Sequence, residues 1–430
     1  MAALMLITCA AFATGPVCVS APGIAALVDD QGNDLVESGL FERVFAVREG
    51  ELFAAGDRNG YRLFDAEGRP VTDQTFSMIS DAGDCLIFRR GDCFGAMDCS
   101  GGTIVEPEWT QLVCDGAGGF LALDSDPLDD RPDEIVHIDG AGEVHRTGVR
   151  CAGGLEVFHD GRMPFRASDG RFGAVDPTGA CVIPARWRYI GAFIGGVAAA
   201  ADDGGHGVLD ARGNAVVPMR YEWLDRGATM IVGLDAASGI DVYAADGSRL
   251  LYSLPGTGLQ AALVGDYLAV ADAAQSRLYD ASGAQLCIAS AEAAFYPGVG
   301  GQFISSDGVW GEPCQRLMGP DGTEIAAGFQ RLLPLCAGRY AWMRLPGVKY
   351  YSDDLGRLQT SWNYDGLRWG LADNAGNKLT DAAYLEIRAL GADRLLLLTE
   401  DEAILADADG AEIRRWPLAA GEGSSSETGA

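Results

Sequence analysis

An Asp-x-x-Gly motif recurs about every 35 residues along this 430-residue chain. Nine of the eleven motif glycines have Asp three residues earlier, and the glycines are Gly32, Gly68, Gly101, Gly142, Gly179, Gly213, Gly247, Gly283, Gly322, Gly376 and Gly410. A period of this size is typical of small structural units that cannot bury their apolar faces alone and must stack on their neighbours. The repeat therefore predicts a scaffold of tandem units rather than a fold organised around one active site.

The repeat extends beyond the turn motif. Aromatic residues lie eleven positions after the motif aspartate, at Phe76, Trp109, Trp187, Tyr221 and Tyr384. Aliphatic residues follow three positions later, at Ile79, Leu112, Ile190, Leu224 and Ile387. Because a single unit is too small to enclose its own aromatic side chain, neighbouring units are expected to share a core.

The unit at residues 171–200 shows the pattern clearly. Strands are predicted at 171–176, 181–183, 187–193 and 197–200. Asp176 can accept backbone N–H groups in a turn for which Gly179 supplies a positive φ. The second strand is expected to stop at Pro184, which cannot donate to a sheet ladder. Three or four short strands per copy predict an all-β array.

A second motif is an aromatic-Gly pair that begins four residues before the motif aspartate, and Trp369-Gly370-Leu-Ala-Asp373 is its fullest form. Variants with another first residue are Phe94-Gly95, Phe172-Gly173 and His206-Gly207. With the Asp-x-x-Gly turn, these motifs resemble the WG-repeat proteins over nearly the whole chain. The resemblance implies a repeat architecture and no catalytic residues. The residues expected to have structural roles in the repeat are Asp65, Gly68, Asp98, Gly101, Trp109, Asp176, Gly179, Trp187, Asp210, Gly213, Tyr221, Trp369, Gly370, Asp373, Gly376 and Tyr384.

The two ends of the chain suggest how the array is completed. The last copy has a first strand at 403–407 and a second at 412–416, but no third or fourth. Residues 17–21 align with the fourth strand of a copy that lacks its start, and residues 4–7 could form the third. Complementary half-copies of this kind close propellers, so a β-propeller-like toroid is predicted. Since eleven copies exceed the usual four to eight or so blades, an open β superhelix or solenoid is the alternative.

We divide the sequence into three parts. Residues 1–22 are either closing strands or a signal peptide, because residues 1–13 are apolar and end in Ala-Phe-Ala but have no preceding Lys or Arg. Residues 23–418 are the WG-like repeat domain, and the Gly- and Ser-rich residues 419–430 are a predicted disordered tail. A cytoplasmic location is favoured, with a secreted or cell-envelope location as the alternative if the signal peptide is real.

The formal net charge is -29, and the chain has two lysines, Lys349 and Lys378. Nucleic acid and anionic membranes bind clustered positive charge, so neither is an expected partner. No uncharged apolar run approaches the ~20 residues needed to span a bilayer. A neutral or basic partner is compatible with the charge, and the acidity itself is explained by solubility.

The chain has eleven cysteines and no Cys-x-x-Cys spacing. Cys85, Cys93, Cys99 and Cys114 fall within one copy and could supply a metal site or a disulfide, but their spacings match no standard zinc motif. The preferred interpretation is buried thiols in a reducing compartment. No metal and no cofactor are expected.

Three of the four histidines, His137, His145 and His159, lie in one degenerate copy. They could line a metal site or an acid–base pocket, although their spacing along strands does not by itself bring them together. The acidic loop 124–130 lacks the glycine and the terminal glutamate of a calcium-binding hand loop. We therefore predict no catalytic residues.

The longest interval between motif glycines predicts one copy with an insertion at about residues 345–362. Exposed aromatic residues on loops often contribute to binding, although they can also form a small cluster of their own. The candidate ligand-contact residues in this insertion are Tyr350, Tyr351 and Trp362.

These patterns favour a non-catalytic repeat scaffold that binds an unidentified protein or peptide as a monomer. One alternative is a secreted or cell-surface module that binds glycan or envelope components, which would lose its basis if every tryptophan lay in the core. Another is a propeller-type hydrolase or lyase that uses acids such as Asp139 and Asp160. That enzyme requires His137, His145 and His159 to converge in one pocket.

Overall fold

The computed structural model describes residues 15–37, 39–124, 133–308, 312–352, 358–362 and 364–418. Contacts group the chain into two compact units, one made of residues 1–70 with 297–430 and the other of residues 71–296. The predictions made for residues 1–13, for most of the acidic loop and for the tail lie outside the described residues. In the described part, the helical structure is a single 3-10 turn, η1 (Tyr364–Gly366).

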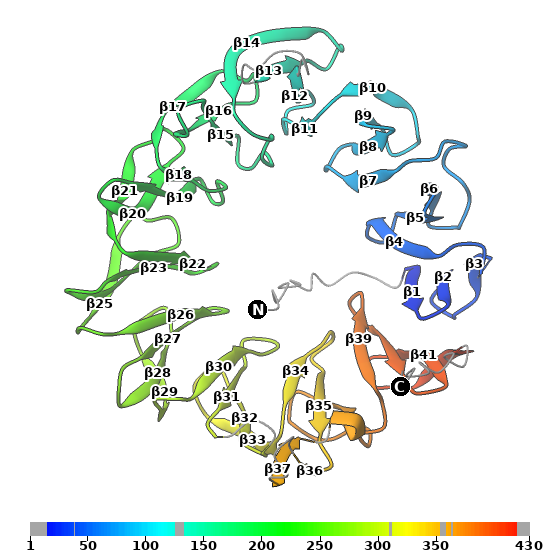
Figure 1. Cartoon of the computed structure of the whole chain (residues 1–430), viewed down its shortest axis with the longest axis vertical. Coiled ribbons are helices and arrows are strands. Elements are labelled where there is room, and N and C mark those ends of the chain that lie inside the picture. Colours follow the sequence, from blue (N-terminus) through cyan, green and yellow to red (C-terminus); the bar gives the residue numbers. More distant parts are fainter. Residues whose placement is uncertain are drawn as a thin grey trace. The chain divides into compact units, whose positions relative to one another are not determined.

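The described residues of the 71–296 unit form six sheets of three or four short antiparallel strands, labelled in Figure 1. The strands are β7 (Met78–Asp81), β8 (Leu86–Arg90), β9 (Cys93–Met97), β10 (Thr103–Trp109), β11 (Leu112–Cys114), β12 (Phe120–Asp124), β13 (Asp133–Ile138), β14 (Val144–Cys151), β15 (Met163–Arg166), β16 (Phe172–Val175), β17 (Cys181–Trp187), β18 (Tyr189–Ile190), β19 (Val197–Asp202), β20 (Gly205–Asp210), β21 (Ala215–Tyr221), β22 (Trp223–Arg226), β23 (Met230–Asp235), β24 (Gly239–Ala244), β25 (Leu250–Pro255), β26 (Gln260–Val264), β27 (Tyr267–Ala271), β28 (Gln275–Tyr279) and β29 (Gln285–Ser290). The sheets are β7–β10, β11–β14, β15–β17, β18–β21, β22–β25 and β26–β29, each paired in sequence order.

The other unit is built in the same way. Its strands are β1 (Val17–Ala21), β2 (Ile24–Val28), β3 (Asp34–Val36), β4 (Arg43–Arg48), β5 (Leu52–Asp57), β6 (Gly60–Asp65), β31 (Phe303–Ser306), β32 (Gln315–Met318), β33 (Glu324–Phe329), β34 (Leu332–Pro334), β35 (Tyr340–Arg344), β36 (Val348–Ser352), β37 (Leu358–Trp362), β38 (Arg368–Ala372), β39 (Glu386–Leu390), β40 (Arg394–Leu398), β41 (Glu402–Asp407) and β42 (Glu412–Pro417). Its sheets include β1-β2-β3, β4-β5-β6, β34-β35-β38 and β39-β40-β41-β42. The division between the units falls within β30 (Ala294–Pro297), the first strand of the sheet that continues through β33.

The chain thus forms an all-β array of small antiparallel sheets of the β-propeller class, which confirms the predicted fold class. Each sheet is a local meander, because its strands are hydrogen-bonded in the order in which they occur in the chain. The exception is β34-β35-β38, where a hairpin is inserted between β35 and β38.

The sheets and the sequence copies are out of phase by half a unit. The copy at residues 171–200 contributes its first two strands to the β15–β17 sheet and its last two to the β18–β21 sheet. The Asp-x-x-Gly turn therefore lies inside a sheet, between its last two strands, and the aromatic residue leads into the next sheet. Each copy consequently connects two neighbouring sheets.

The strand predicted to end at Pro184 continues to Trp187. Phe172 pairs with Trp187 and Ala174 pairs with Ile183, so three residues of β17, including the proline, lie opposite Gly173 alone. The ladder is interrupted there, and for that reason the missing N–H of Pro184 does not end the strand. Our predicted strand end was wrong because the sequence did not reveal this bulge.

The repeated aromatic and aliphatic residues lie in cores between neighbouring sheets, as predicted. One core cluster contains Ile183 from β17, Trp187 and Ile190, and Ala198 from β19, all at most 7% exposed. Phe76 and Tyr221 are fully buried. Adjacent sheets therefore share their apolar residues, which explains why one copy cannot fold alone.

The first and last sheets are neighbours in the 1–70 and 297–430 unit. Val19 and Val28 pack with Leu396, Leu405 and Trp416 in one buried cluster. The predicted split blade is wrong in the described residues, however, because β42 completes a four-stranded sheet of its own and residues 17–21 pair with β2. Each sequence copy is shared between two sheets, so the half-copies at the two ends look complementary although they belong to separate sheets.

The predicted insertion is a β-hairpin. Strands β36 and β37 pair with each other, while β35 pairs directly with β38 as if the insertion were absent. The hairpin therefore extends one copy without disturbing its sheet. No helix in the described residues is long and apolar enough to cross a membrane.

Candidate functional site

The repeated aspartates hold the turns. Asp176 Oδ1 accepts the backbone N–H groups of Thr178 at 2.9 Å and Ala180 at 3.1 Å, and Gly179 has φ +76°. The other predicted turn residues make equivalent bonds or have equivalent positive φ, and they are Asp65, Gly68, Asp98, Gly101, Asp210, Gly213, Asp373 and Gly376. In each of these turns one carboxylate oxygen accepts two backbone N–H groups, so the repeat aspartates are structural.

One consequence is electrostatic. Hydrogen bonds from the Ser100 hydroxyl and from the backbone N–H of Gly102 hold the pKa of Asp98 below its ordinary value. The carboxylate is therefore favoured over the acid, because the charged form accepts these hydrogen bonds more strongly than the neutral form.

The aromatic residues of the two motifs pair across strands. Trp109 pairs with Phe94, Trp187 with Phe172, Tyr221 with His206, and Tyr384 with Trp369. The glycine that follows Phe94, Phe172, His206 or Trp369 is crowded by the backbone of the opposite segment. A Cβ on Gly207 would lie 2.6 Å from the Val217 carbonyl oxygen, and one on Gly370 would lie 2.9 Å from that of Asp381. This motif is therefore also structural.

Two of the three histidines that the enzyme hypothesis requires to converge lie side by side. His137 and His145 are direct partners between β13 and β14, and their rings stack at 5.9 Å. His137 Nε2 lies 3.3 Å from Asp115 Oδ2, and His145 Nε2 lies 2.9 Å from Asp139 Oδ2. The Nε2 atom of each ring is thus held by an aspartate that also accepts the backbone N–H groups of its own turn.

His159 lies elsewhere, in an exposed turn where its backbone pairs with that of Arg162, and Asp160 accepts the backbone N–H of Gly196 at 2.9 Å. The convergence of all three histidines that the enzyme hypothesis requires is therefore not observed. Asp139, Glu143 and His145 offer ligand atoms within 4.8 Å of one another, but Asp139 already bonds the other two residues of this group.

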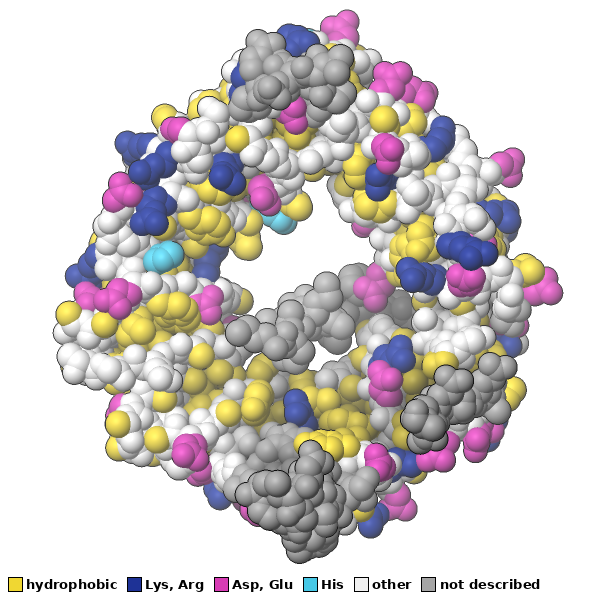
Figure 2. Space-filling model, in the orientation of Figure 1, with side chains coloured by type: hydrophobic (Ala, Val, Ile, Leu, Met, Phe, Trp, Pro, Cys, Tyr) yellow, Lys and Arg dark blue, Asp and Glu magenta, His cyan; other side chains and the backbone are white. Residues whose placement is uncertain are grey.

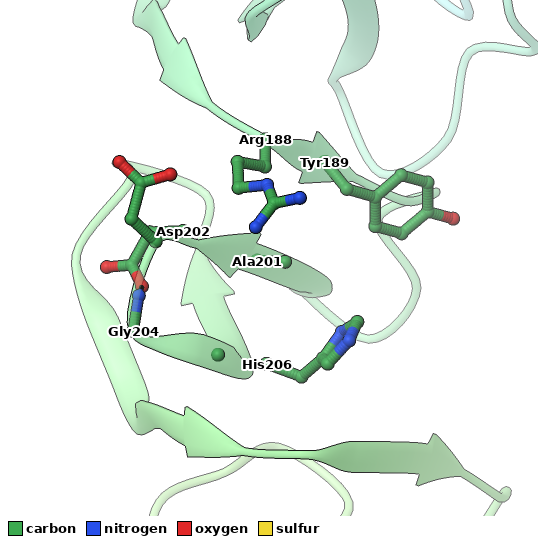
Figure 3. Close-up of a pocket in the computed structure, with 8 residues that line it drawn as sticks. Arg188, Tyr189, Ala201, Asp202, Gly204 and His206 are labelled. Carbon is green, nitrogen blue, oxygen red and sulfur yellow. Dashed lines mark hydrogen bonds between the residues drawn. The ribbon is translucent and has the colours of Figure 1, made fainter.

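A surface hollow of about 380 Å³ lies on the β18–β21 sheet. Tyr189 pairs with Ala201, which in turn pairs with His206, so these residues form one row across three strands. The small methyl group of Ala201 between two rings leaves the space open, as Figure 3 shows. Tyr189 is 49% exposed, although one edge of its ring packs against Phe172 at a centroid distance of 5.9 Å.

The rim of this hollow is charged on both sides. Arg188 lies beside Tyr189, and Asp202 is the last residue of β19 (Figure 3). Asp203 follows in the β19–β20 turn and also lines the hollow. Asp202 accepts the backbone N–H of Gly204 at 2.7 Å, while Asp203 lies 3.4 Å from the Arg171 guanidinium. The hollow therefore offers an aromatic face, a cation and two carboxylates to a ligand.

A second hollow, of about 390 Å³, lies in the other unit and includes Lys378, Arg344 and Gln330. The Lys378 ammonium sits 4.0 Å from the centre of the Trp342 ring, which is itself 8% exposed. The lysine covers the aromatic face, so this hollow presents cations rather than an open ring to solvent.

The predicted ligand contacts Tyr350, Tyr351 and Trp362 occupy the β36–β37 hairpin, in which Val348 pairs with Trp362 and Tyr350 with Thr360. Their side chains lie outside the described part of the structure, so the prediction stays untested. In contrast, sequence reasoning missed Tyr189. The available signal was its position directly before the core residue Ile190, since neighbouring residues of a strand point to opposite faces.

The charged surface is mixed. On the face shown in Figure 2, basic and acidic side chains are interspersed. Several arginines are paired with acids, for example Arg414 with Asp34 at 2.8 Å and Arg277 with Asp272 at 2.9 Å. Pairing of this kind leaves less positive charge available for polyanions.

No family model and no curated protein matches the chain. Solved structures with a similar fold include BamB from Moraxella catarrhalis, with 16% identity over 70% of this chain and 91% of that chain and a TM-score of 0.29. A structure titled eukaryotic initiation factor has 10% identity over 85% of this chain and 96% of that chain, with a TM-score of 0.41. The computationally designed Ika8 protein has 13% identity over 66% and 95%, with a TM-score of 0.28. At these values the likenesses carry no argument about function.

Proposed function

We propose that this protein is a non-catalytic β-propeller scaffold that binds an extended segment of another protein at the hollow of the β18–β21 sheet. The supporting observation is the 49% exposure of Tyr189 beside Arg188 at an open hollow. Tyrosine and arginine are enriched among the residues that dominate binding energy at protein interfaces. The motif resemblance further supports membership of the WG-repeat family, and the cytoplasmic location and monomeric state stay predictions.

The chemistry of the hollow suggests the kind of segment it accepts. An apolar side chain fits between the rings of Tyr189 and His206 over Ala201, and a basic side chain fits the carboxylates of Asp202 and Asp203. The net charge of -29 favours the approach of a neutral or basic segment at long range.

The alternatives have less support. In the described residues each tryptophan is buried or half-buried, which removes the tryptophan basis of the glycan hypothesis there. The enzyme hypothesis lacks its three-histidine pocket, and the two paired histidines are accounted for by contacts with turn aspartates. Binding through an exposed tyrosine needs neither feature.

The test is selection of peptides from a random displayed library with the purified full-length protein. We expect enriched peptides with an apolar residue near Lys or Arg, and a loss of affinity of about tenfold or more for Tyr189→Ala. Tyr296→Ala is the matched control, because Tyr296 is 42% exposed on β30 and lies outside the hollow. Equal affinity of wild type and Tyr189→Ala for the selected peptides would overturn the proposal.

A further inference from the structure

Two cysteines from different sheets meet in the core of the 71–296 unit. Cys85 closes the turn before β8, where its carbonyl oxygen accepts the N–H of Ala82 at 3.0 Å, and Cys114 is the last residue of β11. Their sulfur atoms lie 2.8 Å apart although 29 positions separate them in sequence. Both residues are present as thiols.

Their surroundings fix this contact. Cys85, 5% exposed, belongs to a buried cluster that also contains Ile87 from β8 and Phe120 from β12, and Cys114 packs against its edge. The cluster joins the β7–β10 sheet to the β11–β14 sheet. A disulfide requires a sulfur separation of about 2.05 Å, so the two sulfurs need to approach each other by less than 1 Å.

We propose that Cys85 and Cys114 are a redox modification site at which a disulfide joins the β7–β10 and β11–β14 sheets, with a low-molecular-weight disulfide such as glutathione disulfide as the oxidant. The inference is independent of the proposed binding function. It selects one pair from four neighbouring cysteines whose sequence spacing left the pairing open.

The disulfide forms in two thiol–disulfide exchange steps. Cys114, the more exposed of the two, attacks one sulfur of glutathione disulfide as the thiolate, forms a mixed disulfide and releases one glutathione thiolate. The Cys85 thiolate then attacks the Cys114 sulfur and releases the second glutathione. The two cysteines lose two electrons and two protons, and the glutathione disulfide gains both as two glutathione thiols.

The environment makes this a slow reaction. The hydrogen bond with Cys85, burial and the nearby carboxylates of Asp115 and Asp84 raise the pKa of Cys114 above its ordinary value. Since the thiolate is the attacking species, the rate at neutral pH is low and rises about tenfold per pH unit while the thiol form predominates. The pair is therefore suited to a structural cross-link rather than to rapid sensing.

The test uses the reduced full-length protein incubated with glutathione disulfide, then alkylated and digested without reductant. Trypsin alone leaves Cys93, Cys99 and Cys114 in one peptide, so cleavage after Glu108 must be added to separate Cys114. We expect a peptide pair that joins Cys85 to Cys114 and has lost two hydrogens, together with an increase in Tm that reductant reverses. The pair should form faster at pH 9 than at pH 7.

Two variants make the assignment specific. Cys114→Ser should abolish the cross-linked peptide, and Cys93→Ser should leave it unchanged. Cys181 is exposed, so its glutathionylation is the positive control that the oxidant was active. Alkylation of both Cys85 and Cys114 in wild type under those conditions, or a link from Cys85 to Cys93 or Cys99, would overturn the proposal.

Discussion

Two neighbouring sheets of the same unit differ in how their last two strands pair. In the β18–β21 sheet, His206 pairs with Tyr221 and Val208 with Val217, so three residues of β21 lie opposite Gly207. In the β22–β25 sheet, the equivalent stretch of β24 pairs residue by residue with β25, and Asp241 stands where the first sheet has glycine.

The difference explains the aromatic-Gly motif. Where three residues of one strand lie opposite a single residue, their backbone folds over that position, and at Gly207 an added Cβ would lie 2.6 Å from the Val217 carbonyl oxygen. Two strands that pair residue by residue leave room for a side chain at this position, as at Asp241 in the β24–β25 pair and at Arg277 in the β28–β29 pair. The copies of Gly247 and Gly283, which look degenerate in sequence, lack this bulge and keep a four-stranded sheet.

The largest expected effect comes from filling the space under the bulge. Gly207→Ala should lower the free energy of unfolding by about 3 kcal/mol, because its Cβ would lie 2.6 Å from the Val217 carbonyl oxygen and 2.8 Å from that of Pro218. The measurement is urea unfolding. Arg277→Ala, at the equivalent position of a straight copy, should cost less than about 1 kcal/mol, since it loses only a partly exposed ion pair with Asp272. Equal costs would refute the bulge explanation.

The turn glycines allow a second comparison between a regular copy and a degenerate one. Gly179→Ala and Gly142→Ala both place a Cβ at positive φ, +76° and +82°, which costs about 1–2 kcal/mol. Only Gly179 is also crowded, with Thr147 Cγ2 2.3 Å from the added Cβ, whereas nothing lies within 4 Å at Gly142. Gly179→Ala should therefore be the more destabilising by at least about 1 kcal/mol.

Thermal and urea unfolding of the two variants tests this difference. Adding Thr147→Ser to Gly179→Ala removes the crowding methyl group and should bring the loss of stability close to that of Gly142→Ala. If Thr147→Ser restores no stability to Gly179→Ala, the contact between the turn and β14 is not the reason that alanine is destabilising at position 179.

The junction between the two compared sheets provides a third test. The Tyr221 hydroxyl donates to Asp241 Oδ2 at 2.8 Å and lies 2.6 Å from the Tyr243 hydroxyl. Tyr221→Phe leaves these buried partners without that hydroxyl, and we expect a loss of about 1–3 kcal/mol. Tyr279→Phe, which loses a 3.5 Å contact with Gln285, is the control and should cost less.

The same tyrosine predicts a dependence on alkaline pH. Burial, together with the hydrogen bond between the Tyr221 and Tyr243 hydroxyls, raises the pKa of Tyr221 above the ordinary value of 10.0. The folded state then holds the proton more tightly than the unfolded state, so its contribution to stability is complete below pH 10 and is lost as the pH rises further. Between about pH 9 and about pH 11.5, the free energy of unfolding should fall more steeply with pH for wild type than for Tyr221→Phe.

The smallest effect is expected for a single turn carboxylate. Because the folded pKa of Asp98 lies below its ordinary value of 3.8, its contribution to stability is present above that value and is lost as the pH falls through the folded pKa. Asp98→Asn keeps an oxygen acceptor but removes the charge, so acid unfolding should depend less steeply on pH. Asp30→Asn, an exposed carboxylate in the first turn, controls for the loss of one charge. Identical slopes for the two variants would contradict the turn's role.

The strands and turns were largely predictable because their causes are local. Asp176 and Gly179 determine a turn through bonds and dihedrals that span four residues, and the alternation before and after them marks strands. The strand end at Pro184 was missed because it depends on which residues of β16 lie opposite. The candidate site was missed for the same reason: Tyr189 and His206 are 17 positions apart, and the register of β19 brings them together over Ala201.

The sequence by itself determined that this protein is a tandem all-β repeat with Asp-x-x-Gly turns, because turn hydrogen bonds and strand alternation act within a few residues. Only the tertiary structure decided that sheets and copies are out of phase, that His137 and His145 stack, and that the Cys85 and Cys114 sulfurs meet. These features depend on strand register and on packing between separate sheets. A periodic sequence is compatible with several registers and packings, and the fit of particular side chains in the shared cores selects among them.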